Sequence, residues 1–140
     1  MSSVDLFQFR YSNYNEKARW MLDFKRVPHK RISLLPGPHL FTTKRLTGQS
    51  STPILRIDGT VIAGSANILA ELERRYPEPA LLPADEPGRR RAHEIEQRLD
   101  NDWAPRMRRA VLSTVMEDAR YTARVFGADH STFKIGRAHV

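Results

Sequence analysis

The segment from residue 51 to residue 65 constrains the fold of this chain more than any other. Two short apolar runs, Ile54–Ile57 and Thr60–Ala63, are separated by only two residues, Asp58 and Gly59. Because glycine accepts the positive φ that a two-residue turn requires, this spacing predicts a β-hairpin. The chain is therefore expected to contain an antiparallel pair of strands near its middle.

A proline and a helix start flank this hairpin. Pro53 stands directly before the first strand, where a missing N–H is tolerated, and proline is the residue that takes a cis peptide bond at low cost. Gly64 and Ser65 follow the second strand, and Ser65 is placed to act as the N-cap of a helix that stops at Pro77. The predicted core-facing residues of this helix are Ile68, Leu72 and Tyr76.

The first helix of the chain is predicted from its capping signals. Asn13, with Glu16 three residues later, resembles a capping box, and Ser12 is a competing N-cap. The helix is expected to end near Pro28. Its predicted buried face comprises Tyr14, Ala18, Met21 and Leu22.

The order of the predicted elements indicates the fold class. Strands at residues 4–9 and 29–35 flank the first helix, and a short helical or irregular stretch at residues 39–46 precedes the hairpin. A strand–helix–strand crossover builds a parallel pair with right-handed geometry, whereas the hairpin adds an antiparallel pair. We therefore expect an α/β fold of order βαβαββα, in which a mixed four-stranded sheet carries helices on both faces.

The second half of the chain is predicted to be helical. Residues 78–87 are rich in proline and are expected to form a semi-rigid linker. A long helix starts around Pro87 or Gly88, and Pro105 is expected to kink or break it. A further helix is predicted to begin near Ala119. The predicted buried face of the long helix comprises Ala92, Ile95, Leu99 and Trp103.

These elements define the predicted domain organisation. Residues 1–77 form the α/β domain, residues 78–87 the linker, and residues 88–134 the start of an all-α domain. Residues 135–140 resemble the translated read-through of a sequencing adapter, and we interpret them as an artefact rather than as a genuine short tail. The helical region stops before it could form a closed bundle.

Charge and composition narrow the function classes. The net charge is +7, but residues 1–76 carry 12 Lys and Arg against 6 Asp and Glu, whereas residues 77–140 carry 11 against 10. The excess therefore lies on the domain expected to hold an anionic ligand, and the interleaved acidic residues of the second half favour a solvated helix face over nucleic-acid binding.

Other chemistries are excluded or disfavoured by the residue inventory. The chain has no cysteine, which excludes disulfides and any protein thiol mechanism. No two histidines stand at metal-ligand spacing, so no metal is expected. Charges interrupt every apolar run and the N-terminus lacks a signal peptide, so the predicted location is the cytoplasm, without a membrane segment. The five histidines are His29, His39, His93, His130 and His139.

Three stretches share their motifs with one known family. Residues 12–20, Ser-Asn-Tyr-Asn-Glu-Lys-Ala-Arg-Trp, resemble a first-helix motif Ser-x-Tyr/Phe-Ser/Cys-x-Lys-Val/Ala-Arg. Residues 48–55 resemble a loop that ends in a cis-proline, and residues 62–68 resemble a helix start Glu/Asp-Ser-x-x-Ile. Residues 81–83 match the lead into a helical domain. Over roughly residues 4–112 the chain thus resembles the soluble glutathione transferases of bacterial type, which implies a thioredoxin-like domain followed by helices.

The resemblance implies that the ligand is glutathione. Its γ-glutamyl carboxylate would accept hydrogen bonds from the Ser65 hydroxyl and the Ala66 N–H, because a helix N-terminus favours an anion. The backbone of Thr52, held by a cis bond to Pro53, would pair with the cysteinyl part. From the residues alone, Ser65 is equally a plain N-cap and Pro53 a strand-entry proline. The implied glutathione-binding residues are Gln49, Thr52, Pro53, Gly64, Ser65 and Ala66.

The resemblance also implies a thiolate chemistry. A free thiol has a pKa near ~8.5, and lowering it by one unit takes about 1.4 kcal/mol of preferential anion stabilisation. The N-terminus of the first helix supplies roughly 0.3–1 kcal/mol, and one hydrogen-bond donor could supply the rest. The candidate donors, and hence the predicted catalytic residues, are Ser12, Asn15 and Tyr14, each of which also has a structural interpretation as a capping or core residue.

The chain departs from the family pattern at two of these positions. Asn15 stands where the family has Ser or Cys, and Gly64 stands where an acidic residue receives the α-amino group of glutathione. We predict an enzyme that conjugates glutathione to a small apolar electrophile, as in detoxification. The alternative is a non-catalytic binding or interaction module of the same fold. By resemblance the expected assembly is a homodimer, with no nucleic-acid or membrane partner.

Overall fold

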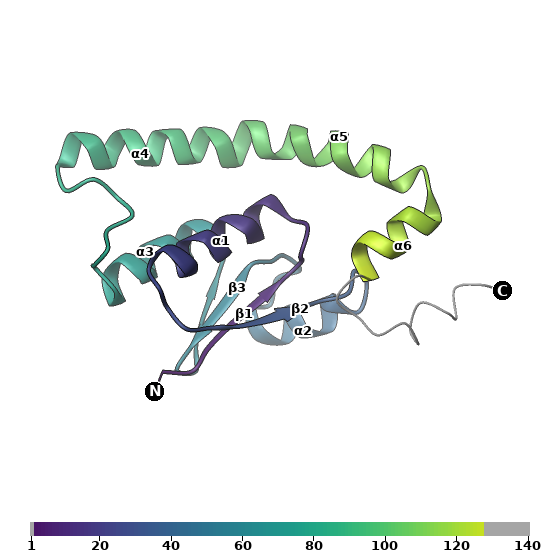
Figure 1. Cartoon of the computed structure of the whole chain (residues 1–140), viewed down its shortest axis with the longest axis horizontal. Coiled ribbons are helices and arrows are strands. Elements are labelled where there is room, and N and C mark those ends of the chain that lie inside the picture. Colours follow the sequence, from purple (N-terminus) through teal and green to yellow (C-terminus); the bar gives the residue numbers. More distant parts are fainter. Residues whose placement is uncertain (1, 128–140) are drawn as a thin grey trace.

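A computed structural model describes residues 2–127 of the chain, and the predicted element order is confirmed. The first part is a βαβαββα unit, and the second part is a run of helices that crosses above it (Figure 1). The elements are β1 (Val4–Gln8), α1 (Asn13–Phe24), β2 (Lys30–Ser33), α2 (His39–Thr47), β3 (Ile54–Ile57), β4 (Thr60–Ala63), α3 (Ser65–Arg75), α4 (Glu86–Arg98), the π-helical turn η1 (Leu99–Trp103), α5 (Ala104–Met116) and α6 (Ala119–Gly127).

The four strands form one mixed sheet in the order β2-β1-β3-β4. β1 runs parallel to β2 and antiparallel to β3, and β3 runs antiparallel to β4. Asp58 and Gly59 both have positive φ, 48° and 86°, as the two-residue hairpin turn requires. α1 and α3 cover one face of the sheet and α2 lies on the other (Figure 1), so helices cover both faces as predicted.

The core lies between the sheet and the α1–α3 layer. Ala18, Met21 and Leu22 of α1 are buried, as are Ile68 and Leu72 of α3, which confirms the predicted faces of both helices. Burying one such aliphatic side chain contributes about 1.5–3 kcal/mol. This packing holds the N-terminal turns of α1 and α3, which carry the candidate site residues.

The capping box predicted at Asn13 and the N-cap predicted at Ser65 are wrong, whereas the competing N-cap of α1, Ser12, is confirmed in position. Ser12 occupies the N-cap position of α1 but its side chain makes no capping hydrogen bond, and Glu16 pairs with Arg19 instead of closing a capping box. At α3 the N-cap is Gly64, and Ser65 is the first helical residue. The left-handed φ of Gly64, +87°, turns the chain out of β4 one residue earlier than the side-chain signal indicated.

The long helix is continuous where a break was expected. α4 begins at Glu86, with the Asp85 carboxylate accepting from the Gly88 N–H at 2.8 Å. The path then continues through η1 into α5 without interruption (Figure 1). Pro105 lies in the first turn of α5, after the widened π turn. The predicted break does not occur, and the departure from a regular α-helix at this point is the π turn η1, directly before Pro105.

The predicted buried face of the long helix is also wrong. Ile95, Leu99 and Trp103 are 49%, 51% and 59% exposed, although Ala92 is half-buried. The face turned to α1 instead carries Glu96, Asp100 and the buried Ala104. Apolar spacing showed which side of the helix is apolar, but that side is not the one that packs against α1.

No helix in residues 2–127 is long and apolar enough to cross a bilayer. The predicted boundaries at residues 77, 87 and 134 remain predictions. Residues 135–140, which we interpret as a sequencing artefact, lie outside the described residues, as do His130 and His139.

Candidate functional site

Asn15 is the polar residue around which the candidate site is built. It lies in the first turn of α1, its side chain is fully buried, and its Nδ2 lies 3.0 Å from Thr52 Oγ1, to which it donates. Its Oδ1 is buried without a hydrogen-bond partner among residues 2–127. A buried amide oxygen without a partner costs free energy, and such an atom marks a place where another group can bind.

The loop before β3 lies beside the start of α3. The Thr52–Pro53 bond is cis, as the resemblance implied. The Gly64 N–H donates to the Pro53 carbonyl at 2.9 Å, directly beyond the Ile54–Ala63 register pair of the hairpin. This hydrogen bond places the α3 N-terminus beside the residue pair that contacts Asn15.

The N-terminus of α3 carries unused donors. Ser65 as a residue is 5% exposed, and its hydroxyl has no hydrogen-bond partner among the described residues. The first N–H engaged by the helix is that of Ile68, which donates to the Gly64 carbonyl at 3.0 Å. The N–H groups of the preceding turn, Ala66 included, therefore remain for an anionic ligand.

The other predicted residues make no hydrogen bond to this cluster within residues 2–127. Tyr14 directs its hydroxyl to the Asp100 carbonyl, 2.7 Å away, on the long helix. Gln49 is exposed in the loop after α2. Ser12 is half-buried, and its carbonyl accepts the Glu16 N–H at 2.8 Å. Hydrogen bonds thus join Asn15 to Thr52 and Gly64 to Pro53, the peptide bond joins Thr52 to Pro53, and Ser65 follows Gly64 in the sequence.

Sequence reasoning assigned no role to Arg19, which organises the loop leading into the site. Arg19 as a residue is 6% exposed. Its guanidinium donates to Gln8 Oε1 at 2.5 Å and to the Arg10 carbonyl at 2.9 Å. It also pairs with Glu16. The arginine of the first-helix motif was the available signal, since a charged residue among apolar core positions must be paired.

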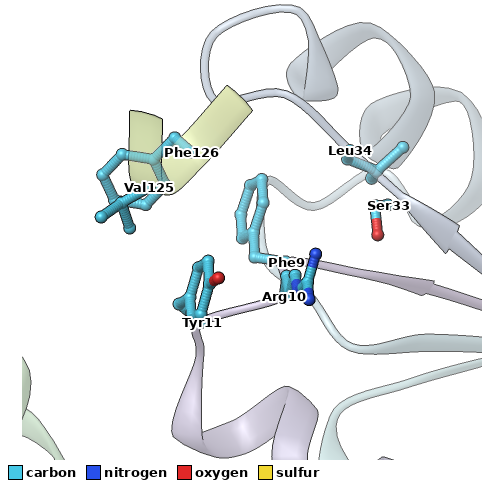
Figure 2. Close-up of a pocket in the computed structure, with 7 residues that line it drawn as sticks. All are labelled: Phe9, Arg10, Tyr11, Ser33, Leu34, Val125 and Phe126. Atoms are coloured by element: carbon cyan, nitrogen blue, oxygen red, sulfur yellow. The ribbon is translucent and has the colours of Figure 1, made fainter. Parts of the chain in front are cut away.

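A small pocket lies beside this loop (Figure 2). Phe9 and Tyr11 face residues of α6 across it, and its volume of about 10 Å³ holds at most one water. A wider open groove of about 870 Å³ adjoins the same loop on the side of Gln8, Glu16 and Arg19. The pocket is lined by Phe9, Arg10, Tyr11, Ser33, Leu34, Val125 and Phe126.

No cluster of three or more potential metal ligands occurs within residues 2–127. The polar features near the site are the buried Asn15 amide at the N-terminal end of α1, the cis Thr52–Pro53 bond and the main-chain N–H groups in the first turn of α3.

Comparison with known proteins places the chain in a family. Residues 6–80 match the model of the glutathione S-transferase N-terminal domain. That match covers more than half of the chain and includes every residue of the candidate site. The chain therefore belongs to the glutathione S-transferase family, with an N-terminal thioredoxin-like domain and part of the helical region.

The similar proteins share this assignment. A maleylpyruvate isomerase of a Ralstonia species is 33% identical over 131 residues, which is 91% of this chain and 58% of that protein. A holo structure of maleylpyruvate isomerase, a zeta-class bacterial glutathione transferase, superposes with a TM-score of 0.69 at 33% identity, covering 89% of this chain and 57% of that one.

A glutathione transferase of Methylobacterium radiotolerans, solved with glutathione sulfonate, superposes with a TM-score of 0.68 at 27% identity and covers 89% and 61% of the two chains. The chain spans about half the length of the curated relatives it matches, between 48% and 58%.

Proposed function

We propose that this chain binds glutathione and stabilises its thiolate for addition to a small electrophile. The observation that carries the proposal is the buried Asn15 amide, which contacts Thr52 with one end and has no partner at the other. It lies in the first turn of α1, where the helix N-terminus favours a negative charge. A full enzyme of this type acts as a homodimer by family resemblance, and that assembly is part of the proposal.

The glutathione backbone is expected to lie along the loop before β3 and the start of α3. The γ-glutamyl carboxylate accepts hydrogen bonds from the unpartnered Ser65 hydroxyl and from the Ala66 N–H. The Thr52 main chain pairs with the cysteinyl residue, and Gln49 and Gly64 border the same position. This arrangement supports the binding of an acidic peptide at the end of the sheet where β3 begins and α3 starts.

Asn15 can donate to the thiolate through one rotation of its amide. The Thr52 hydroxyl both donates and accepts, so either end of the Asn15 amide can bind it. With Oδ1 accepting from Thr52, Nδ2 faces the unpaired side and donates to sulfur. In the opposite orientation a carbonyl oxygen would repel the thiolate. Glutathione binding is thus expected to select the donating orientation, with Ser12 as the alternative donor.

The electrophile defines two outcomes of the same chemistry. In conjugation, the thiolate adds to an electrophilic carbon and the thioether is the product. The relatives named as maleylpyruvate and maleylacetoacetate isomerases favour a second candidate, isomerisation of a cis double bond conjugated to carbonyl groups. There the thiolate adds, the resulting single bond rotates, and elimination reforms the double bond and releases glutathione unchanged.

Calorimetric titration of glutathione tests the binding site. Ser65→Ala removes a hydrogen bond to a charged acceptor and is expected to weaken affinity about tenfold or more. Ser113→Ala, at an exposed serine of α5, is the matched control and should bind as the unchanged chain does. Equal affinity of both variants would contradict the placement of the carboxylate, and no binding by the folded chain would favour a non-catalytic module.

The role of Asn15 is tested by the ionisation of bound glutathione. Asn15→Ala is expected to raise the pKa of the bound thiol, which is followed by the ultraviolet absorbance of the thiolate as pH changes. Gln97→Ala, at an exposed amide of α4, serves as the control. An unchanged thiol pKa in Asn15→Ala would transfer the donor role to Ser12. Turnover of an aryl halide against that of a maleyl acid then separates conjugation from isomerisation.

A further inference from the structure

The first turn of α1 is tied to the long helix on both sides of Asn15. The Tyr14 hydroxyl donates to the carbonyl oxygen of Asp100 at 2.7 Å. Lys17 Nζ lies 2.8 Å from Asp100 Oδ2 and 2.5 Å from Glu96 Oε1. The turn that carries the thiol-facing amide is therefore held by a residue 85 positions further along the chain.

The Asp100 carbonyl is available because of the π turn and the proline that follows it. In a regular α-helix the Ala104 N–H would bond this carbonyl. In η1 the Ala104 N–H bonds the Leu99 carbonyl instead, and the next residue, Pro105, has no N–H. The Asp100 carbonyl thus lacks the main-chain donor that a regular helix provides, and the Tyr14 hydroxyl supplies one.

Tyr14 is able to donate at neutral pH. Burial raises the pKa of its hydroxyl above the ordinary value, and the Asp100 carboxylate acts in the same direction, whereas Arg108 and Lys17 lower it. The hydroxyl therefore stays protonated. Loss of its contact would also leave the Asp100 carbonyl unsatisfied in a half-buried position, which adds to the cost.

We propose that Asp100, η1 and Pro105 form an anchor for the site helix, and that Tyr14 is a positioning residue which fixes the rotation of the first turn of α1 about its axis. Consecutive residues of an α-helix point about 100° apart. Holding Tyr14 on the long helix therefore directs Asn15 to Thr52. The inference rests on the proposed function for the use of Asn15 toward the glutathione thiol.

A double-mutant cycle tests this anchor. Tyr14→Phe removes only the hydroxyl, and Pro105→Ala restores an N–H so that the segment can return to a regular α-helix in which Ala104 bonds Asp100. With Pro105 present, Tyr14→Phe should weaken glutathione binding about threefold to tenfold and raise the pKa of the bound thiol. In the Pro105→Ala background, Tyr14→Phe should change neither the affinity for glutathione nor the pKa of the bound thiol. Tyr121→Phe, at an exposed tyrosine of α6, is the control.

Hydrogen exchange provides a readout that does not depend on glutathione. Tyr14→Phe should accelerate exchange of the amide protons at residues 16–18 in the chain with Pro105, and should leave them unchanged in the Pro105→Ala background. Equal effects of Tyr14→Phe in both backgrounds would overturn the anchor. If exchange shows the coupling while the unchanged chain binds no glutathione, the anchor stands and the proposed function fails.

Discussion

At the scale of single residues, Gly64 marks the clearest difference from the family pattern. It precedes α3 with φ +87° and ψ 142°, a region nearly restricted to glycine. A Cβ there would meet only Asn67 Nδ2 at 3.9 Å, so space is available and the cost of a side chain is conformational. Glycine relieves backbone strain at this position, but it has no carboxylate for the α-amino group of the proposed glutathione ligand.

Replacement of Gly64 separates strain from recognition. Gly64→Ala and Gly64→Glu should both lower the free energy of unfolding, by about 1–3 kcal/mol. If the α-amino group of glutathione lies at this position, Gly64→Glu should nevertheless bind glutathione more tightly than Gly64→Ala. Urea denaturation and calorimetric titration of the two variants measure both quantities. Equal affinities would place the amino group elsewhere.

At the scale of elements, a buried lysine joins the end of α1 to α3 and the segment that follows it. The Lys25 side chain has no exposed surface, and its Nζ donates to the carbonyls of Tyr76 at 2.5 Å and Pro79 at 2.9 Å. It also lies 2.6 Å from Glu73 Oε1, which accepts the Leu81 N–H at 2.9 Å. A buried ammonium is stable only when paired in this way.

The Lys25–Glu73 pair predicts a pH dependence of stability. Burial alone would raise the pKa of the Glu73 carboxyl, but the hydrogen bonds from Lys25 and the Leu81 N–H outweigh it and lower the pKa from 4.5. A lowered folded-state pKa contributes stability that is fully present above the unfolded pKa and is lost as pH falls through the folded value.

Glu73→Gln should therefore lower stability by about 1.5–3 kcal/mol at neutral pH. It should also reduce the loss of stability below about pH 4.5, the unperturbed value for this carboxyl. Urea denaturation at neutral and acidic pH measures both effects. Glu94→Gln, at an exposed glutamate of α4, is the control. A variant that remains as acid-sensitive as the unchanged chain would show that other carboxylates dominate.

At the scale of the whole molecule, the long helix presents an apolar stripe to solvent. Large apolar side chains recur every four residues along α4, η1 and α5, and each of these residues is about half exposed or more. Isolated exposed apolar residues are ordinary, but a contiguous row of this kind favours association. The stripe comprises Ile95, Leu99, Trp103, Met107 and Val111.

The stripe should make this chain associate as its concentration rises. Met107→Lys with Val111→Lys is expected to lower light scattering and the binding of a hydrophobic dye, because two charges interrupt the apolar row. Gln97→Lys with Ser113→Lys adds the same charge at exposed positions outside the stripe and is the matched control. Similar scattering from both double variants would assign the effect to net charge alone.

Local chemistry explains the parts of the fold that could be predicted. The hairpin strands match their predicted bounds, since Asp58 and Gly59 specify the turn without help from distant residues. The buried faces of α1 and α3 follow from helical spacing against a sheet. The six implied glutathione-binding residues came from family resemblance. The structure brings four of them, Thr52, Pro53, Gly64 and Ser65, together with Asn15.

The remainder depends on contacts between residues far apart in the chain. Asn15 meets Thr52 across 37 positions and Tyr14 meets Asp100 across 86, and neither pairing leaves a local pattern. The same is true of the face that the long helix turns to α1, because apolar spacing shows which side of a helix is apolar but not what packs there. Turn and helix propensities act within a few residues, whereas burial and side-chain partners are set when the whole chain packs.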